Sequence, residues 1–155
     1  MLKVAISFDY DTPIGYKESF HIQNTPTFAE IEGTEEILSI FIKYNITATF
    51  GVVAKILNDQ KYKDVFRKQI IQINELGHEI CSHSYSHQYL PSLQKDALIN
   101  EIKLSKEVLE DCVNKDIKGF IPPFNCPMNF PQKGAFSISE LLGLYGRGFS
   151  KNSLG

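Results

Sequence analysis

The chain lacks the features that mark several large classes of protein. It has only three cysteines in 155 residues and no CxxC pair, so neither a disulfide framework nor a thiolate zinc site is indicated. No apolar run approaches the length of a membrane span, and the first apolar run meets a carboxylate too early for a secretion signal. The 16 basic and 18 acidic side chains give a net charge of -2, which offers no electrostatic footprint for nucleic acid or an anionic membrane. We therefore expect a soluble, cytoplasmic protein.

The composition is that of an ordinary globular domain. Apolar residues make up 43% of the chain, and 10 glycines and 7 prolines are too few for a collagen-like or low-complexity sequence. A chain of this length buries roughly two thirds of its unfolded surface, so it needs no disulfide or metal to stabilise it. The sequence predicts a single domain over residues 1–155.

Strand-like and helix-like patterns alternate along the chain. Apolar and β-branched runs predict strands at residues 4–8, 46–53, 79–82 and 117–121. Helical patterns occupy residues 33–44, 65–76, 98–112 and 139–145. The Glu and Lys side chains between residues 95 and 110 are expected on the solvent side of their helix. Because helical crossovers join successive parallel strands, this alternation predicts an α/β fold with a parallel sheet or a β/α barrel.

Acidic and imidazole side chains follow the first and third predicted strands. Asp9 and Asp11 come directly after the first strand, and the period of an extended strand points both to one side. His83 and His87 frame the segment HSYSH, a spacing that lets both imidazoles face one ion across a tight loop or helical turn. The carboxyl ends of parallel strands share one edge, so we expect these groups close together. Two imidazoles and one carboxylate leave open coordination positions, as a catalytic metal requires.

Four segments of the chain form a recognisable series. They are SFDYD, ATFGVV, GHEICSHSYSH and KGFIPPFN, in that order. The series resembles the polysaccharide deacetylases, also called the NodB homology domain or carbohydrate esterase family four, whose first motif is usually TFDDG. The resemblance implies an incomplete parallel β/α barrel containing the first four to five strands, apparently truncated at the C-terminus.

The resemblance also implies a reaction, which is metal-dependent hydrolysis of an N-acetyl group on a carbohydrate with release of acetate. Asp9 falls on the family's general base. Asp11, His83 and His87 fall on its metal ligands, and zinc is the usual metal. The expected partner is an N-acetylated sugar, with no role for nucleic acid or a membrane.

The last of the four segments, KGFIPPFN, which resembles the family's third motif, adds a substrate contact. The chain also departs from the family at two points. Pro123 and Phe124 fall on the substrate-binding side, where a backbone N–H after the prolines helps to hold the oxyanion. Ile121 stands where the family usually has an arginine beside the base. The histidine that protonates the leaving amine belongs to the family's last motifs, which have no counterpart here. His78 is expected instead as a surface or cap residue. His21, in a long loop, is the remaining histidine that could reach the site.

Two alternative functions, and what covers the open edge of the barrel, stay open at this point. A catalytically inactive module that retains the metal and binds a sugar or another chain would also explain Ile121 and the missing acid. An iron-dependent oxygenase uses the same ligand set, although its usual all-β scaffold does not match the alternation. The open edge of an incomplete barrel predicts self-association, a second covering chain, or a longer gene product.

Overall fold

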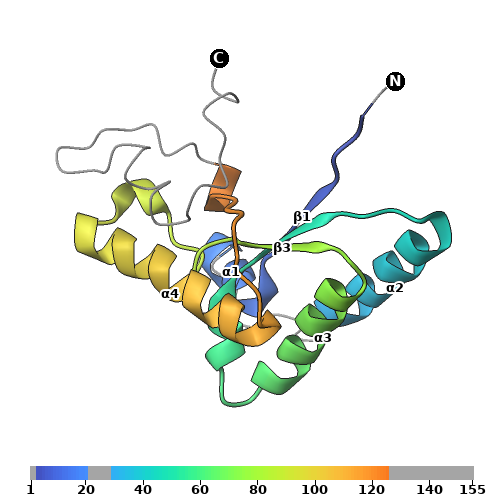
Figure 1. The fold of residues 1–155 in the computed structure, drawn as a ribbon. Helices are drawn as coiled ribbons and strands as arrows, with labels where there is room; N and C mark the ends of the chain where they lie inside the picture. Colours follow the sequence, from blue (N-terminus) through green and yellow to red (C-terminus); the bar gives the residue numbers. More distant parts are fainter. Residues whose placement is uncertain (1–2, 21–28, 126–155) are drawn as a thin grey trace.

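The computed structural model describes residues 3–20 and 29–125, in which helices pack along a short parallel sheet (Figure 1). The strands are β1 (Ser7–Tyr10), β2 (Thr49–Val52) and β3 (Glu79–Ser82), in the order β1-β2-β3. Both strand pairs are parallel, and their register aligns Asp9 with Gly51 and Gly51 with Cys81. The predicted α/β class with a parallel sheet is confirmed.

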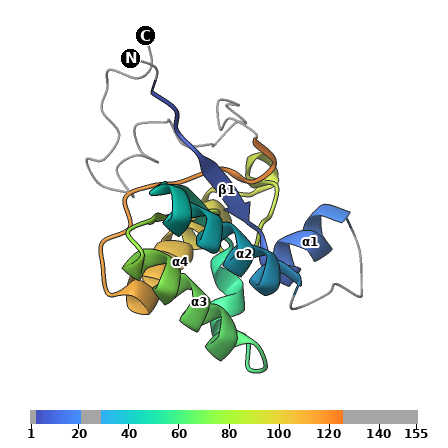
Figure 2. The ribbon, with the colours of Figure 1, turned by 90° about the vertical axis from the view of Figure 1, so that its right-hand side faces the viewer.

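In the described part of the chain, four α-helices follow or connect the strands. They are α1 (Thr12–Phe20), α2 (Ala29–Tyr44), α3 (Lys63–Glu75) and α4 (Lys95–Val113). Short 3-10 turns are η1 (Ala54–Asn58), η2 (Leu90–Ser92) and η3 (Pro123–Asn125). Figure 2 shows α1 just beyond the end of β1, apart from α2, α3 and α4. Within residues 3–20 and 29–125, no helix is both long and apolar enough to cross a membrane.

The main core lies between the sheet and the helices. Alternate strand residues, including Phe50, Val52 and Ile80, join buried side chains of α2, α3 and α4 in one cluster. Phe66 of α3 and Leu109 of α4 are fully buried in it. Burial of an apolar side chain of this size contributes roughly 1.5–3 kcal/mol. The opposite sheet face carries the residues in between, so Asp9, Gly51 and Cys81 share that side.

The strand ends differ from the sequence-based expectation. β3 matches the prediction, whereas β1 begins three residues later than expected and contains Asp9. The shift has a simple cause, because the ladder to β2 begins at Ser7 opposite Thr49 and residues before it extend past the partner strand. Val4, at the predicted start, is 74% exposed.

The predicted strand at residues 117–121 is reduced to one isolated parallel bridge between Ser82 and Phe120. Ser82 donates its N–H to the Gly119 carbonyl, and Ile121 donates to the Ser82 carbonyl at 2.8 Å. Two prolines follow Ile121, and proline has no N–H to continue a ladder. The expected fourth strand is therefore too short to count as one.

Two helices also depart from the predictions. α1 was not expected, because its sequence contains a proline and a glycine and shows no apolar period. Pro13 lies in the first turn, where its missing N–H costs little. A Cβ at Gly15 would lie 2.8 Å from Asp11 Cβ and 3.4 Å from His87 Cγ, so only glycine lets α1 approach these two residues. α2 begins at Ala29, four residues earlier than predicted. The helix predicted at residues 139–145 lies outside the described residues.

His78 corrects a further expectation, because it is buried rather than at the surface. Only 5% of the residue is exposed, and its ring packs against Phe41 and Phe50 with centroid distances of 5.5 Å. Its Nδ1 accepts a hydrogen bond of 3.2 Å from the Ala48 N–H. Burial lowers the pKa of His78. It is a core residue at the opposite end of the sheet from the other two described histidines.

The strand order places β1 at one edge of the sheet, paired within the described part of the chain with β2 alone. The open edge expected from the sequence belongs to the last strand of an incomplete barrel, so the edge position of β1 does not test it. Coverage of that edge by a second copy or another chain remains a prediction.

Two glycines of opposite conformation give a matched test of the helix assignments. Gly77 ends α3 with φ of 86°, Gly33 lies within α2, and a Cβ at either would meet nothing within 4 Å. Gly77→Ala should lower the free energy of unfolding by about 1–2 kcal/mol because of its positive φ. Gly33→Ala should raise it by about 0.5–1 kcal/mol through helix propensity. Urea denaturation measures both, and equal effects of the same sign would contradict the assignment.

The buried His78 should make stability depend on pH. Burial lowers its pKa in the folded state, whereas the unfolded chain binds a proton below an ordinary value of 6.5. The free energy of unfolding should therefore decrease as the pH falls through that value. His78→Asn keeps an acceptor for the Ala48 N–H but does not titrate. Denaturant titrations between about pH 7.5 and 5 should give a smaller pH slope for this variant. An unchanged slope would rule out His78 as the source.

Candidate metal centre

Asp11 is positioned by the turn between β1 and α1. The next residue, Thr12, is fully buried and has φ of 62°, which is rare for a β-branched side chain. Glu30 of α2 accepts the Thr12 N–H at 3.0 Å, and Thr12 Oγ1 accepts the Ile14 N–H at 3.3 Å. α2 therefore holds the backbone from which the Asp11 carboxylate projects.

Glu30 was not identified from the sequence. Burial raises its pKa to about 7, with the nearby Asp11 carboxylate as a further cause. Its Oε2 is buried and has no hydrogen-bond partner among the described residues. In sequence Glu30 looks like an ordinary first-turn acid that favours a helix N-terminus, and only the folded chain brings it to the turn after Asp11.

The two histidines are carried by the loop that follows β3. Ser84 and His87 have φ of 66° and 60°. Ser84 Oγ accepts the His87 N–H at 3.0 Å, and Ser82 Oγ accepts the Ser84 N–H at 3.1 Å. The sequence allowed either a tight loop or a helical turn for the HSYSH segment. The structure shows the tight loop.

Hydrogen bonds at Nδ1 orient both imidazoles. His83 Nδ1 lies 2.8 Å from the Ile121 carbonyl, which can only accept, so this nitrogen carries the proton. His87 Nδ1 lies 3.3 Å from Ser19 Oγ of α1. Such partners fix the ring and leave Nε2 free to bind a metal.

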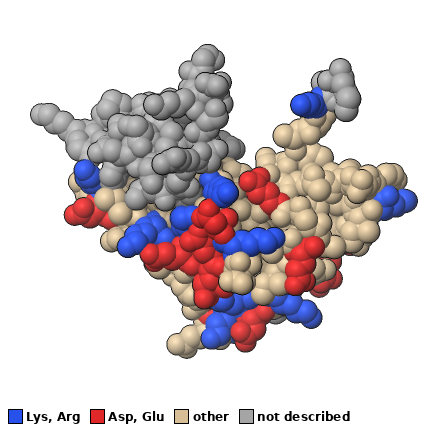
Figure 3. Space-filling model, viewed as in Figure 1, with Lys and Arg blue, Asp and Glu red and all other residues tan. Residues whose placement is uncertain are grey.

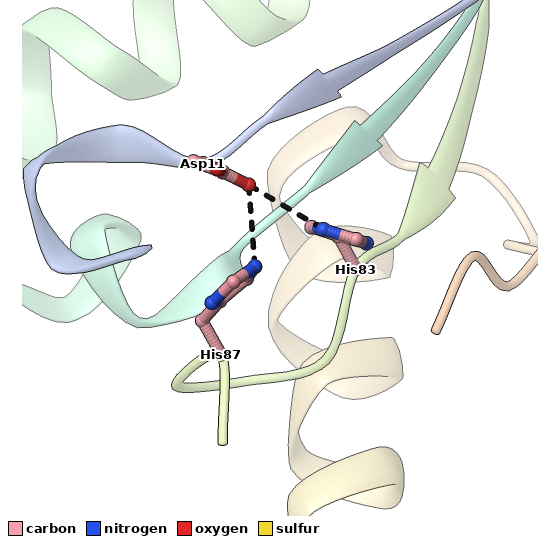
Figure 4. A group of neighbouring side chains, drawn as sticks. All are labelled: Asp11, His83 and His87. Carbon is pink, nitrogen blue, oxygen red and sulfur yellow. Dashed lines mark ion pairs between the residues drawn. The ribbon is translucent and has the colours of Figure 1, made fainter. Parts of the chain in front are cut away.

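The three predicted ligands meet at one point (Figure 4). Nε2 of His83 and Nε2 of His87 each lie 3.4 Å from Asp11 Oδ1. One ligand atom from each residue falls within 4.8 Å of the others. Both histidines are buried, and the Asp11 side chain is 24% exposed. The structure therefore confirms that these side chains are neighbours, contributed by the ends of β1 and β3.

The donor set fits a divalent cation. Asp11 Oδ1 is buried without a hydrogen-bond partner in the described part of the chain, although buried oxygens are nearly always paired. In the neutral tautomer with the proton at Nδ1, His83 turns the lone pair of Nε2 toward this oxygen. Facing lone pairs are stabilised by a positive charge between them. Two imidazoles and one carboxylate are a common ligand set for zinc and for first-row metals of similar chemistry.

Burial and the Asp11 charge have opposite effects on the two imidazoles. Burial works to lower the pKa of His83, but contact with Asp11 and the hydrogen bond to Ile121 outweigh it and raise the pKa. Burial dominates at His87, whose pKa is lowered. The Asp9 carboxylate lies close enough to act on both rings in the direction of a raised pKa.

Asp9 and Ile121 lie on the sheet face opposite the main core. Asp9 is exposed and pairs in register with Gly51. A Cβ at Gly51 would lie 3.0 Å from Ile121 Cδ1 and 3.6 Å from His83 Cβ. The Ile121 side chain therefore covers the strand next to Asp9. The structure places an apolar group there, and no described cation pairs with Asp9.

The third motif closes one side of the site. Pro123 is buried, and Phe124 is 45% exposed with φ of 61°. The Phe124 ring lies 4.7 Å from the His87 ring and 6.1 Å from that of Tyr89, measured between centroids. Both residues are thus near the ligands, and their contact with a substrate remains a prediction. His21 lies outside the described residues, as does the segment RGFSKNSL (residues 147–154), which resembles a strand that lies mid-domain in the family.

Removal of one ligand should abolish tight metal binding. In Asp11→Ala or His87→Ala, the affinity for Zn²⁺ should fall by more than about 100-fold, since changes around the ligands alone cost 10–100-fold. Glu32→Gln removes an exposed acid of α2 and serves as the matched control. Isothermal titration calorimetry of metal-free protein measures the three affinities. Unchanged affinity in either ligand variant would exclude the proposed centre.

The curated relatives of this chain are deacetylases. It is 25% identical over 91 residues to a bifunctional xylanase/deacetylase of Pseudobutyrivibrio xylanivorans, covering 59% of this chain and 14% of that protein. It is 25% identical over 127 residues to the peptidoglycan deacetylase of Helicobacter pylori, covering 78% and 41%. It is 28% identical over 95 residues to the peptidoglycan-N-acetylglucosamine deacetylase of Bacillus cereus, covering 61% and 32%. The chain spans less than half the length of each of these relatives.

Solved structures share the fold. The Xyl-CE4 domain of a multidomain xylanase from the hindgut metagenome of Trinervitermes trinervoides has a TM-score of 0.60 at 22% identity, covering 81% of this chain and 50% of that one. A family 4 acetyl xylan esterase from Clostridium thermocellum, solved with a cobalt ion, has a TM-score of 0.57 at 26% identity, covering 78% and 48%. A CE4 family pseudoenzyme from Bacillus anthracis has a TM-score of 0.58 at 17% identity, covering 78% and 35%.

The model of the polysaccharide deacetylase family matches residues 3–129. This range contains β1, β2, β3 and all three ligands of the candidate metal centre. The chain therefore belongs to the polysaccharide deacetylase family.

Proposed function

We propose that this chain carries the metal-binding part of a hydrolase that removes an acetyl group from the nitrogen of a carbohydrate. The observation that carries the proposal is the convergence of Asp11, His83 and His87 on one point, with the buried Asp11 Oδ1 otherwise unpaired. Membership of a family whose relatives are deacetylases supports it. A cobalt ion in the related acetyl xylan esterase supports a divalent metal, and zinc is the proposed one.

A bound divalent ion would act as a Lewis acid on the acetyl carbonyl and lower the pKa of a bound water. The residues of this chain supply the surroundings for that chemistry. Asp11, His83 and His87 hold the ion, and the Nδ1 contacts of the two rings keep both Nε2 atoms directed at it.

Asp9 is the proposed general base. It is a carboxylate beside the ligands, and its charge acts on both imidazoles. In this proposal the Asp11 oxygen between the two imidazole rings binds the metal. Asp9 is exposed and is free to accept a proton from an attacking water. Phe124 lies against His87 and is the proposed neighbour of the acetyl group.

One observation favours a second function. Ile121 places an apolar side chain beside Asp9, where the resemblance leads us to expect an arginine that orients the base. One structure of similar fold, from Bacillus anthracis, is described as a CE4 family pseudoenzyme, which supports keeping an inactive alternative. The alternative is a metal-retaining module that binds a sugar or pairs with another chain.

Asp9→Asn separates the two functions. With Zn²⁺ or Co²⁺ added, the unsubstituted chain should release acetate from chitooligosaccharides or acetylated xylan. Asp9→Asn should reduce the rate by about 100-fold or more while it still binds metal, because general base catalysis contributes 10²–10⁴-fold.

Enzymatic acetate detection and calorimetric metal titration measure the two properties on the same samples. Asp59→Asn, an exchange of similar chemistry in the turn before α3, is the control and should leave both unchanged. Metal binding without acetate release from the unsubstituted chain would favour the inactive module.

A further inference from the structure

The loop of residues 83–87 holds a costly backbone conformation. Ser84 and His87 both have positive φ, a region that favours glycine, yet the loop sequence HSYSH contains no glycine. Such a conformation persists where the surrounding structure over-determines it. Besides the bond from the His87 N–H to Ser84 Oγ within the loop, contacts from outside the loop therefore help to set the position of His87.

The first half of the loop is held by η1. The Ala54 N–H donates to the Ser84 carbonyl at 3.2 Å, and the Lys55 N–H donates to the Tyr85 carbonyl at 2.8 Å. These bonds fix the chain up to Tyr85. They do not reach the residue that directly precedes His87.

That residue, Ser86, is held by Glu101 of α4. The Ser86 N–H donates to Glu101 Oε1, and the Ser86 hydroxyl lies 3.0 Å from each carboxylate oxygen. Both residues are buried, with 5% and 7% of their surfaces exposed. Two groups of Ser86, its N–H and its hydroxyl, thus contact the same buried carboxylate. Hydrogen bonds to a carboxylate are about twice as strong as neutral ones.

The same face of α4 also supports the start of the loop. Ser105 lies one helical turn after Glu101, and its Oγ is 2.6 Å from Ser82 Oγ, which accepts the Ser84 N–H. α4 therefore contacts the loop at both ends. Glu101 corrects the expectation that every acid between residues 95 and 110 faces solvent, which holds for Glu107.

We propose that Glu101 is a positioning residue of the metal centre, which holds Ser86 so that the strained loop presents His87 Nε2 to the ion. The inference rests on the metal centre of the proposed function. It means that Glu101, a buried acid that does not itself bind the metal, affects the metal affinity and the coordination geometry.

Glu101→Gln tests the proposal. The amide keeps the shape of the side chain but replaces one acceptor oxygen by an NH₂ group that faces the Ser86 hydroxyl. The Zn²⁺ affinity, measured by calorimetry on metal-free protein, should fall by about 10–100-fold. The visible absorption of the Co²⁺-loaded protein, which reports ligand geometry, should change in position or intensity.

Two controls separate positioning from stability. Glu107→Gln removes an exposed acid of the same helix and should leave affinity and spectrum unchanged. Val113→Ala truncates a buried side chain near the end of α4 and should lower the free energy of unfolding without weakening metal binding.

Ser86→Ala keeps the backbone bond to Glu101 and removes the two hydroxyl contacts, so it tests the same link if Glu101→Gln fails to fold. It should weaken Zn²⁺ binding by less than Glu101→Gln does. Combined with Glu101→Gln, it should add little, because both changes break the same contacts.

If the unsubstituted chain binds Zn²⁺ and both Glu101→Gln and Ser86→Ala bind it equally well, the positioning role is wrong while the metal centre stands. The same conclusion follows if Val113→Ala loses as much affinity as Glu101→Gln. If the unsubstituted chain binds no metal, the metal centre and this inference both fail.

Discussion

The arrangement of this protein depends on one interaction, the approach of two imidazole nitrogens to a single oxygen of Asp11. Each Nε2 lies 3.4 Å from Oδ1, and this oxygen has no other partner in the described part of the chain. The contact joins the ends of β1 and β3 across β2. Gly15 brings α1 against Asp11 and His87, and the Ile121 carbonyl fixes the ring of His83. Several unrelated segments are thus arranged around one small volume.

The same convergence explains where the chain stores backbone strain. Thr12, Ser84 and His87 all have positive φ, and all lie beside or within the ligand set. Each strained turn is held by an acid from a helix, the half-buried Glu30 at the first and the buried Glu101 at the second. The helices therefore contribute more than apolar burial. On the visible face of the molecule, by contrast, acidic and basic side chains intermingle without a single-sign patch (Figure 3), as the net charge of -2 suggests.

The sequence was sufficient for features that depend on local pattern. β3 was predicted from its apolar run. α4 was predicted from side chains on one face that recur at intervals of three and four residues. Because the ends of parallel strands meet at one edge of the sheet, Asp9, Asp11, His83 and His87 were expected to lie close together. These features need only the order of residues along the chain and the general geometry of a parallel sheet, whereas the choice of Asp11 over Asp9 as a ligand came from the resemblance to the family.

The remaining features depend on tertiary contacts that no local pattern shows. α1 has no apolar period, and its own Gly15 permits close packing against Asp11 and His87. His78 is buried by aromatic rings from α2 and β2. From the sequence, Glu101 resembled a solvent-exposed acid of a helix. Its spacing from Leu98 and Ser105, which both face the buried side of α4, was a signal that could have identified it as buried.

The central claim is that one divalent cation is bound jointly by Asp11, His83 and His87. Anomalous diffraction at the zinc absorption edge, from a crystal grown with Zn²⁺, tests it most directly. The account predicts one strong peak about 2.0–2.2 Å from both Nε2 atoms and from a carboxylate oxygen of Asp11. A peak elsewhere on the molecule, or none at this position in protein saturated with zinc, would contradict it.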